Sequence, residues 1–544
     1  MARITSRFDD SNRRVTLAPF PSHPRQRGQA LVFSLITVSI IILVMVSMYT
    51  MGQQSINKMK LQNTADAAAY SAALAEARDY NFSAYTNRAV VANQVAVAQV
   101  VGLTSWARNY GNTYAGPSSW VPKVLSSLGG PMAKIFWDVP WNASKTISKG
   151  VKQTFETIGP ITTVLLDKLI DVLGLAQTVY HYGTALTVAQ TIGLSPAQIL
   201  DDLAGVDESS LGVVSDLLTF NDAYNIIKLN DVNADLSTPG TVAAMMHIAQ
   251  WFLFTHKKDP NMLNQDGPAA DRMAKVTIDS LDGFSRNRST KDGGPFKNMP
   301  EMMYLTPFVI DPTRLIPYQN GALLMYLWHR GGTELKKVNN TKKTWSAMDG
   351  TGFFGAAIFW ISVLGIPIPI PIILPFIPMG WGAAQAGLNS NLMPNNNFGT
   401  TAANAYGGIY QSPNTAGAAA IQRGKGAGKS LDPAAGLRTY FDVKKVNKPA
   451  LVGPPLVLEI EKAGNKIPTS NSISGGQFAL NNGTQSNYMR SLSKAEIYFS
   501  RPKKLWARSD GKTEVGSLYS PYWQARLAPN SFAEQYVSLA FHLN

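Results

Sequence analysis

The most apolar part of the chain lies near its N-terminus, where the 22 residues from Ala30 to Met51 carry no charge. A helix of roughly 20 apolar residues, rising about 1.5 Å per residue, crosses a hydrocarbon core roughly 30 Å thick. The run lacks the small-x-small exit of a cleavable signal peptide and continues through Gln53 into more helix-forming sequence. The pattern therefore predicts an uncleaved transmembrane anchor in the lipid bilayer, with positions that include Ala30, Leu35, Ile40, Val44 and Met51.

After the anchor, the pattern stays helical and becomes rich in small residues. From Leu61 to Tyr110 the chain is dominated by Ala, Gln, Asn and Val, and the first proline after the anchor is Pro117. Small apolar residues recur at helical spacing, which suits close packing of helices. A single helix from Gln29 to Tyr110 would be about 120 Å long, so we expect a bend. The weak helix formers at positions 81–83 predict a kink or break there.

Residues 113–295 show the periodicity of helices separated by Gly and Pro. Ser195-Pro196 is typical of a helix start, and Thr241 to His256 predicts a further helix that is too short to span a membrane. One helix is expected to be amphipathic and to bury the face formed by Ile161, Leu165, Leu169 and Leu173, with Asp167, Lys168 and Asp171 on the opposite side.

From about residue 300 the pattern changes to short apolar or alternating runs between turn residues, which predicts strands. We therefore expect an α+β fold with a long N-terminal transmembrane helix, a helical middle block and a mixed or antiparallel β-rich C-terminal region. The predicted strands are Ala322 to His329, Pro455 to Ile460, Ala495 to Ser500 and Tyr522 to Leu527, and the predicted regions are 1–27, 28–112, 113–295 and 296–544.

A second charge-free run, Phe353 to Trp381, is interrupted by alternate prolines. In a strand, successive N–H groups point to opposite sides, so prolines two apart strip one edge while the intervening isoleucines keep their donors. The run therefore predicts a hairpin that turns at Leu364-Gly365, with a contact segment Ile366, Pro367, Ile368, Pro369, Ile370 and Pro371. The hairpin would meet a partner subunit, dip into lipid or pack on the helical block; a second membrane span stays an open alternative.

Charge is distributed unevenly around the anchor. Six arginines and two aspartates precede it, so the positive-inside rule keeps residues 1–27 in the cytoplasm and places the bulk of the chain outside. Residues 421–544 hold 17 Lys and Arg against 8 Asp and Glu. This excess would attract anionic envelope polymers or form a solvated face. The absence of cysteine excludes disulfides and thiolate chemistry.

No motif for catalysis, cofactors, metals or specific nucleic-acid binding emerges from the sequence. Arg423 stands where a phosphate-binding loop ending at Lys429-Ser430 requires its first glycine. The six histidines are far apart, and Asp201-Asp202 lie in a helical stretch where neighbouring side chains point apart. Ser491 and Lys494 have Ser-x-x-Lys spacing without companion motifs. We expect the aromatic cluster of Trp506, Tyr519, Tyr522 and Trp523 to form a sheet core.

One phrase carries a family resemblance. Arg27-Gly28-Gln29-Ala30-Leu31-Val32, the anchor, and the helix-packing phrase Leu61, Gln62, Asn63, Thr64, Ala65, Asp66, Ala67, Ala68 resemble the N-terminal module of TadE/TadG-like proteins of Flp (Tad) pilus assembly, over residues 26–75. The phrases 85–89 and 520–527 extend the likeness toward both ends of the chain. Two departures limit it. Phe33 stands where processed pilins have Glu, and the strings 207–211 and 235–239 lack the last hydroxyl of a von Willebrand A metal site, so neither processing at Gly28 nor such a domain is expected.

The resemblance implies a non-enzymatic, single-pass protein of the bacterial inner membrane, with its bulk periplasmic or extracellular. It would serve as a scaffold or minor subunit beside other pilus or secretion-system subunits, and its small-residue stripe would pack against similar helices. The alternative is an anchored surface module that binds envelope polysaccharide or another anionic polymer through the basic C-terminal region.

Overall fold

A computed structural model describes most of the chain. The described residues are 29–115, 138–194, 225–258, 272–286, 288, 302–309, 320–338, 341–363, 366–387, 430–443, 451–470, 488–502, 511 and 514–543. They form an α+β fold with a long apolar N-terminal helix and antiparallel sheets in the C-terminal region, as the sequence predicts.

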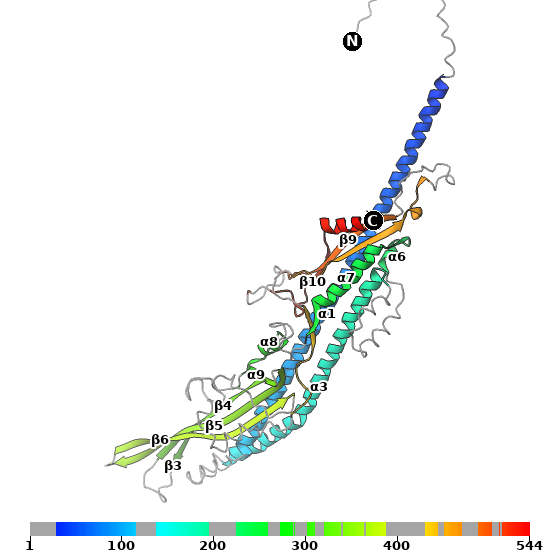
Figure 1. Cartoon of the computed structure of the whole chain (residues 1–544). Helices are drawn as coiled ribbons and strands as arrows, with labels where there is room; N and C mark the ends of the chain where they lie inside the picture. Colours follow the sequence, from blue (N-terminus) through cyan, green and yellow to red (C-terminus); the bar gives the residue numbers. More distant parts are fainter. Residues whose placement is uncertain are drawn as a thin grey trace, which may run out of the picture.

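The axis of the molecule is α1 (Gln29–Ala115), a single helix of 87 residues and roughly 130 Å. Its first part extends free of the other elements, and the rest of the protein is arranged along its remaining length (Figure 1). Anchor and extension thus form one element. The predicted break at 81–83 is wrong, because the helix runs through these positions without interruption.

Tertiary contacts explain why the weak helix formers do not break α1. The side-chain amide of Asn81 donates to the carbonyl of Trp523 at 2.9 Å, and its oxygen accepts from the Trp523 N–H at 3.0 Å. Phe82 packs on Tyr180 with ring centroids 4.3 Å apart, and Ser83 is fully buried. These contacts outweigh a propensity cost of a few tenths of a kcal/mol per residue.

We call the described residues other than the free N-terminal part of α1 the body. The half of the body nearer that N-terminal part contains a four-stranded antiparallel sheet packed on α1. Its strand order is β1 (Ala234–Leu236), β8 (Leu456–Ala463), β9 (Tyr488–Phe499), β10 (Trp523–Leu527). Around it lie α6 (Ile226–Asn230), α7 (Thr238–Phe254), the β2–β7 pair (Thr255–Lys258 and Tyr440–Val443), η5 (Gly464–Lys466) and α12 (Phe532–Leu543). Because β1 pairs with β8, the predicted helical and β-rich regions share this sheet.

The second long helix, α3 (Val139–Thr191), lies beside α1 (Figure 1). The predicted face is wrong in orientation, because Ile161, Leu165 and Leu169 are 65%, 68% and 45% exposed. Asp167 and Ile170 are buried instead. Close packing on α1 and an ion pair between Asp167 and Arg438 determine which face of α3 is buried, so most of its apolar stripe remains exposed on the surface of the protein. The helix expected at Ser195-Pro196 lies outside the described residues.

The far half of the body contains a second four-stranded antiparallel sheet, in the order β3 (Met302–Val309), β4 (Asn320–Val338), β5 (Thr341–Val363), β6 (Ile366–Ala386). The short helices α8 (Arg272–Asp279) and α9 (Gly283–Arg286) lie beside it. Val363 pairs with Ile366, which confirms the predicted hairpin, and residues 353–381 belong to strands rather than to a helix. β6 is an edge strand, where alternate prolines are tolerated.

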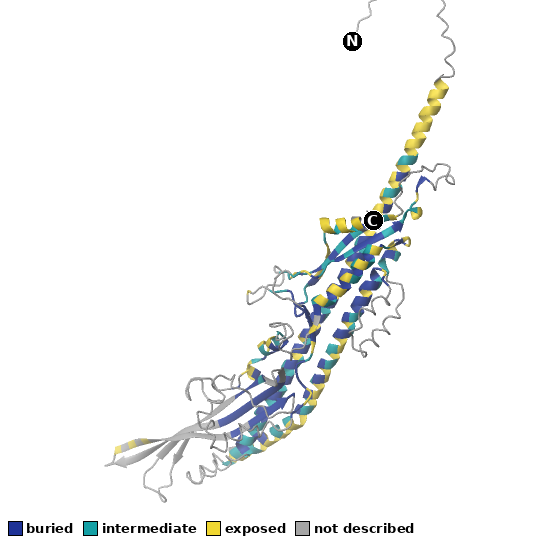
Figure 2. Ribbon diagram, in the orientation of Figure 1, coloured by how far each residue is buried: buried dark blue, intermediate teal, exposed yellow. Residues whose placement is uncertain are grey.

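The hydrophobic core is distributed along α1 rather than gathered in one centre. One cluster of buried residues joins the 61–80 stretch of α1 to α3, α7 and the first sheet. The second joins the 90–101 stretch to α8, the bases of β4, β5 and β6, and the segment around Tyr440. Figure 2 shows the change along α1, from an exposed N-terminal part to a buried remainder.

Candidate functional site: an exposed anchor and a buried spine on one helix

The N-terminal part of α1 is apolar and exposed. Among the described residues one helix is long and apolar enough to cross a membrane; it is α1, and no part of its most apolar window is buried in the protein. Leu35, Ile40, Val44 and Met51 are 63%, 55%, 47% and 71% exposed, and Ala30 is exposed as well. Serine and threonine hydroxyls within this part donate to carbonyls of their own helix, for example Thr37 to Phe33 at 2.8 Å.

The small-residue stripe of α1 is buried by the chain itself. Leu61, Ala65 and Ala68 have no exposed surface, and the same holds for Ala69 and Ala72. Gln62, Asp66 and Ala67 are half-buried, while Asn63 is exposed. The buried residues of the helix-packing phrase therefore pack on this chain's own first sheet and helices, so this face is not open to a neighbouring subunit.

Side chains of the helix-packing phrase also hold the first sheet. The Gln62 amide donates to the Asp66 carboxylate at 2.9 Å and to the Leu492 carbonyl on β9 at 3.2 Å. One turn earlier, the ammonium of Lys58 donates to the carbonyl of Arg490. These bonds fix the register of β9 along the helix at the point where α1 leaves its apolar part.

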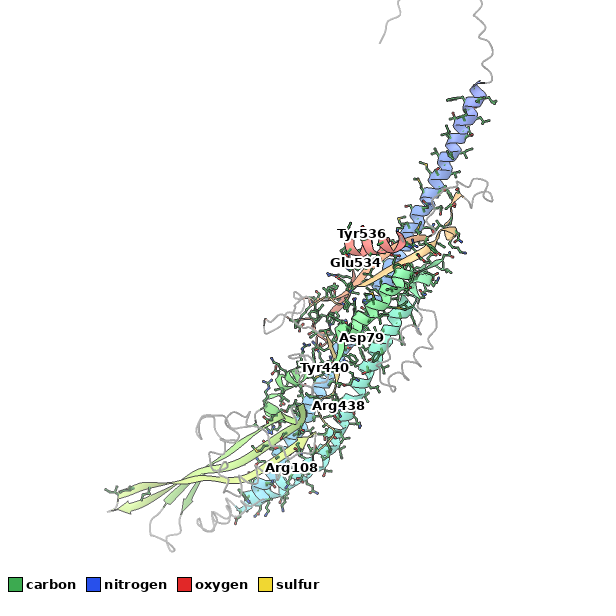
Figure 3. The ribbon with its side chains drawn as sticks, viewed as in Figure 1. Asp79, Arg108, Arg438, Tyr440, Glu534 and Tyr536 are labelled. Atoms are coloured by element: carbon green, nitrogen blue, oxygen red, sulfur yellow. The ribbon has the colours of Figure 1, made fainter. Side chains whose placement is uncertain are left out.

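Two buried carboxylates follow on α1, and each faces a histidine. Asp79 lies 2.6 Å from Nδ1 of His181 on α3, and both side chains have no exposed surface (Figure 3 labels Asp79). Glu76 lies 2.5 Å from Nε2 of His247 on α7. Burial alone would lower the pKa of His247, but the charge and hydrogen bond of Glu76 outweigh it, so the pKa lies above its usual value.

A third polar group joins the far half of α1 to the second sheet. Ser105 on α1 donates to the Asp349 carboxylate on β5 at 2.5 Å, and the Arg288 guanidinium grips the same carboxylate with bonds of 2.8 and 2.9 Å. The Asn109 amide donates to the Thr351 hydroxyl at 2.7 Å. A planar Arg–carboxylate fork of this kind fixes orientation as well as distance.

Each of the two further phrases of the resemblance bonds to residues just outside the other, although about 430 positions separate them. Asn87 donates to the carbonyls of Phe441 and Leu518 at 2.9 and 2.7 Å, and Arg88 donates to the carbonyl of Tyr519 at 2.5 Å. The side chain of Asn81 pairs with the backbone of Trp523. Sequence reasoning flagged both phrases but had no signal for their contact, because the bonds go to backbone carbonyls.

The described residues that were considered as candidates for catalysis or metal binding have structural roles. The described residues contain no group of three or more His, Cys, Asp or Glu side chains placed to hold a metal ion. His181 and His247 are held in the buried pairs above. Ser491 is buried on β9, and Lys494 pairs with Glu534 at 2.7 Å. Of the expected aromatic cluster, Trp523 and Tyr522 belong to one core cluster and Tyr519 to the other, while Trp506 lies outside the described residues. Residues 423–429 and Asp201-Asp202 lie outside the described residues.

Many basic residues of the C-terminal region are paired with carboxylates. Lys462 bonds Asp231 at 2.9 Å, and Arg438 reaches Asp167 and Asp171 at 2.6 and 2.8 Å (Figure 3 labels Arg438). Further pairs are Arg490–Glu461, Lys494–Glu534, Arg501–Glu514 and Arg526–Glu496. The local excess of positive charge is therefore partly neutralised within the fold. Burial raises the pKa of Asp167 to about 6 despite the attraction of Arg438.

Comparison with known proteins settles what the N-terminal half of α1 is. Residues 28–76 match the model of the Tad family, whose description is Flp pilus-assembly TadE/G-like. These residues form a Tad-like module. The match covers the exposed anchor and the helix-packing phrase, and it ends at Glu76, the first of the two buried carboxylates. No curated protein and no solved structure matches the chain at a significant level.

The Tad-like module supports a role related to pilus assembly. It accounts for less than a tenth of the chain, so the role of the body depends on its own structure. In that body, α1 continues the module for nearly forty residues as the element on which both sheets and α3 pack.

Proposed function

We propose that this protein is a non-enzymatic, single-pass component of a pilus-assembly or related secretion apparatus, anchored in the inner membrane by residues 30–51, with its N-terminus in the cytoplasm. The observation that carries the proposal is the continuity of α1. One uninterrupted helix joins the exposed apolar part of the Tad-like module to a body held on the helix by buried polar pairs.

A rigid connection of this kind suits a scaffold or minor subunit. Because the helix-packing phrase is already covered by the body, contacts with other pilus or secretion-system subunits would use the exposed part of α1 within the bilayer. Small hydroxyl residues there, such as Ser34 and Ser39, bond to their own backbone and leave a smooth surface for close helix packing.

Deleting the gene and counting surface pili, together with secretion through the same apparatus, tests the proposal. We expect loss of pili or of secretion, restored by the full chain but not by a chain that lacks residues 30–51. Unchanged piliation and secretion in the deletion strain would contradict it.

A further inference from the structure

The far end of the second sheet consists of four strand segments without a charged residue. We call residues 302–309, 320–328, 352–363 and 366–379 the blade. They contain no Asp, Glu, Lys, Arg or His. Their register shows that the segments lie side by side, with Phe308 opposite Gly321, Gly321 opposite Phe359 and Phe359 opposite Ile370.

The blade also lacks the alternation of a sheet that has one face in water. β9 in the first sheet alternates buried and half-buried positions along most of its length. In the blade, apolar residues occupy adjacent positions, as in Phe353-Phe354 and Leu323-Leu324-Met325, so the sequence lacks a polar residue at every second position. Such strands are typical of sheets that are covered on both faces. Ile366, Ile368 and Ile370 are nevertheless 65%, 45% and 40% exposed.

The blade lies too far from the anchor to reach the same bilayer. The base of the sheet is pressed against the end of α1, because an added Cβ at Gly380 or Gly382 would collide with Thr113 or with the Ser105 carbonyl. From Met51 to Thr113 the helix spans roughly 90 Å. The blade extends beyond that point, away from the anchor (Figure 1).

The dimensions of the blade match a bilayer. A strand needs about 9–11 residues to cross the hydrocarbon core, and Phe353–Val363 of β5 provides eleven. Aromatic residues occur in register rows toward both ends of the blade, and Tyr326 opposite Phe354 lies between these rows. Trp328 lies opposite Gly352 near the base, and Phe359 and Trp360 lie toward the tip. At about 3.3 Å per residue these rows are roughly 26 Å apart, close to the apolar band of about 25 Å between the aromatic girdles of membrane strands.

Prolines reduce the number of unpaired N–H groups at the edges of the blade. An open edge in hydrocarbon leaves N–H groups unpaired, each at a cost of several kcal/mol. On the outer edge strand β6, residues Pro367, Pro369 and Pro371 have no N–H, while the isoleucines between them occupy the alternate register positions opposite β5. Pro307 removes a donor from β3, the other edge strand. The same prolines disfavour pairing of β6 with a strand of another molecule.

We propose that the blade inserts into a second lipid bilayer, separate from the one that α1 crosses. The protein would then bridge two membranes, or an apparatus in one membrane and the lipid surface of another. The charge-free length, the aromatic rows and the prolines at the edges support lipid over a second copy of this chain as the occupant.

The test uses the full-length protein held by α1 in nanodiscs, to which protein-free vesicles of phosphatidylcholine and phosphatidylglycerol are added. We expect the nanodiscs to float with the vesicles at both low and high salt. Ile368→Asp should reduce the floated fraction at least tenfold. The matched control is Leu169→Asp on α3, because Leu169 and Ile368 are both 45% exposed; the control should float as the wild type does.

A fluorescent probe separates insertion from other associations. Because the chain has no cysteine, a single Cys can be placed at Ile368 and labelled with an environment-sensitive dye, with Lys168→Cys on α3 as the control. We expect a blue shift at position 368 on addition of vesicles, and quenching by spin labels deep in the acyl chains. Absence of flotation, or equal loss with Leu169→Asp, would overturn the proposal. A blue shift that appears when the protein concentration is raised without vesicles would also overturn the proposal, and would indicate an interface between copies of this chain.

Discussion

The two parts of α1 belong to one helix but have opposite relations between polarity and burial. Residues 30–51 are the more apolar part and are exposed, whereas residues 61–115 are richer in Asn, Gln and Asp and are largely buried. In water this arrangement would be unstable, since exposed apolar surface costs about 25 cal/mol per Å². The difference teaches that the two parts need different surroundings: the protein's own body covers the second part, and in the proposed function lipid surrounds the first.

The polar groups in the buried part give the body its register along the helix. Glu76 pairs with His247, Asp79 pairs with His181, and Asn87 bonds two backbone carbonyls. Without such partners, a buried charge is costly. An apolar helix could slide or rotate among packed neighbours, but a helix with these groups has one position in which each group meets its partner. Buried pairs of this kind add specificity more readily than stability.

The largest effect should come from breaking a buried carboxylate–histidine pair of α1. Asp79→Ala leaves His181 in a fully buried site without its carboxylate and should lower the free energy of unfolding of the body by about 3–5 kcal/mol. Thermal unfolding in nanodiscs measures this. Asp235→Ala is the matched control, because Asp235 is 65% exposed in its pair with Lys228 and should change stability by about 0–1 kcal/mol. Equal losses of stability in the two variants would show that the buried pair contributes no more than the exposed pair.

A charge in the exposed part should act on membrane insertion instead. Ile40→Asp places a carboxylate near the middle of the apolar run, at a cost of about 3 kcal/mol for insertion. We expect a larger fraction of the chain outside the membrane pellet, with the same unfolding temperature for the body. A lowered unfolding temperature with full membrane retention would reverse the assignment of the two parts.

Added volume should distinguish the two parts in the same way. Ala68 has no exposed surface, so Ala68→Leu should overpack the interface and cost about 1–3 kcal/mol. Ser39→Leu adds a larger apolar side chain to the exposed part and should leave the unfolding temperature of the body unchanged. If Ala68→Leu were neutral and raised oligomerisation instead, the helix-packing phrase would be an intermolecular surface after all.

The smallest effect should come from pH. The pKa of His247 lies above its usual 6.5 in the folded protein, so its contribution to stability is full below about pH 6.5 and is lost as pH rises through the folded pKa. We expect a modest fall in unfolding temperature between pH 6.5 and pH 9, absent in His247→Gln. A wild type and variant with parallel profiles would contradict this.

The sequence predicted the elements whose signal is local. The long apolar N-terminal helix, the hairpin at residues 353–381, and the strands at 455–460, 495–500 and 522–527 all follow from short-range pattern and are confirmed. The predictions that failed depend on tertiary contacts. Asn81 stabilises α1 by a hydrogen bond to the backbone of Trp523. Packing on α1 and the ion pair between Asp167 and Arg438 determine which face of α3 is buried. Likewise the pairs of Glu76 and Asp79 with histidines 171 and 102 positions away leave no mark in local sequence.

Topology in the native membrane tests most directly whether α1 is an anchor that carries the body outside the cytoplasm. The cysteine-free chain allows single substitutions, Lys168→Cys in the exposed part of α3, where the Lys168 side chain is 73% exposed, and Ser6→Cys in the N-terminal tail. In intact spheroplasts an impermeant thiol reagent should label position 168, and label position 6 only after lysis. Labelling of position 6 with protection of position 168, or labelling of both only after lysis, would contradict the anchor and orientation proposed for this protein.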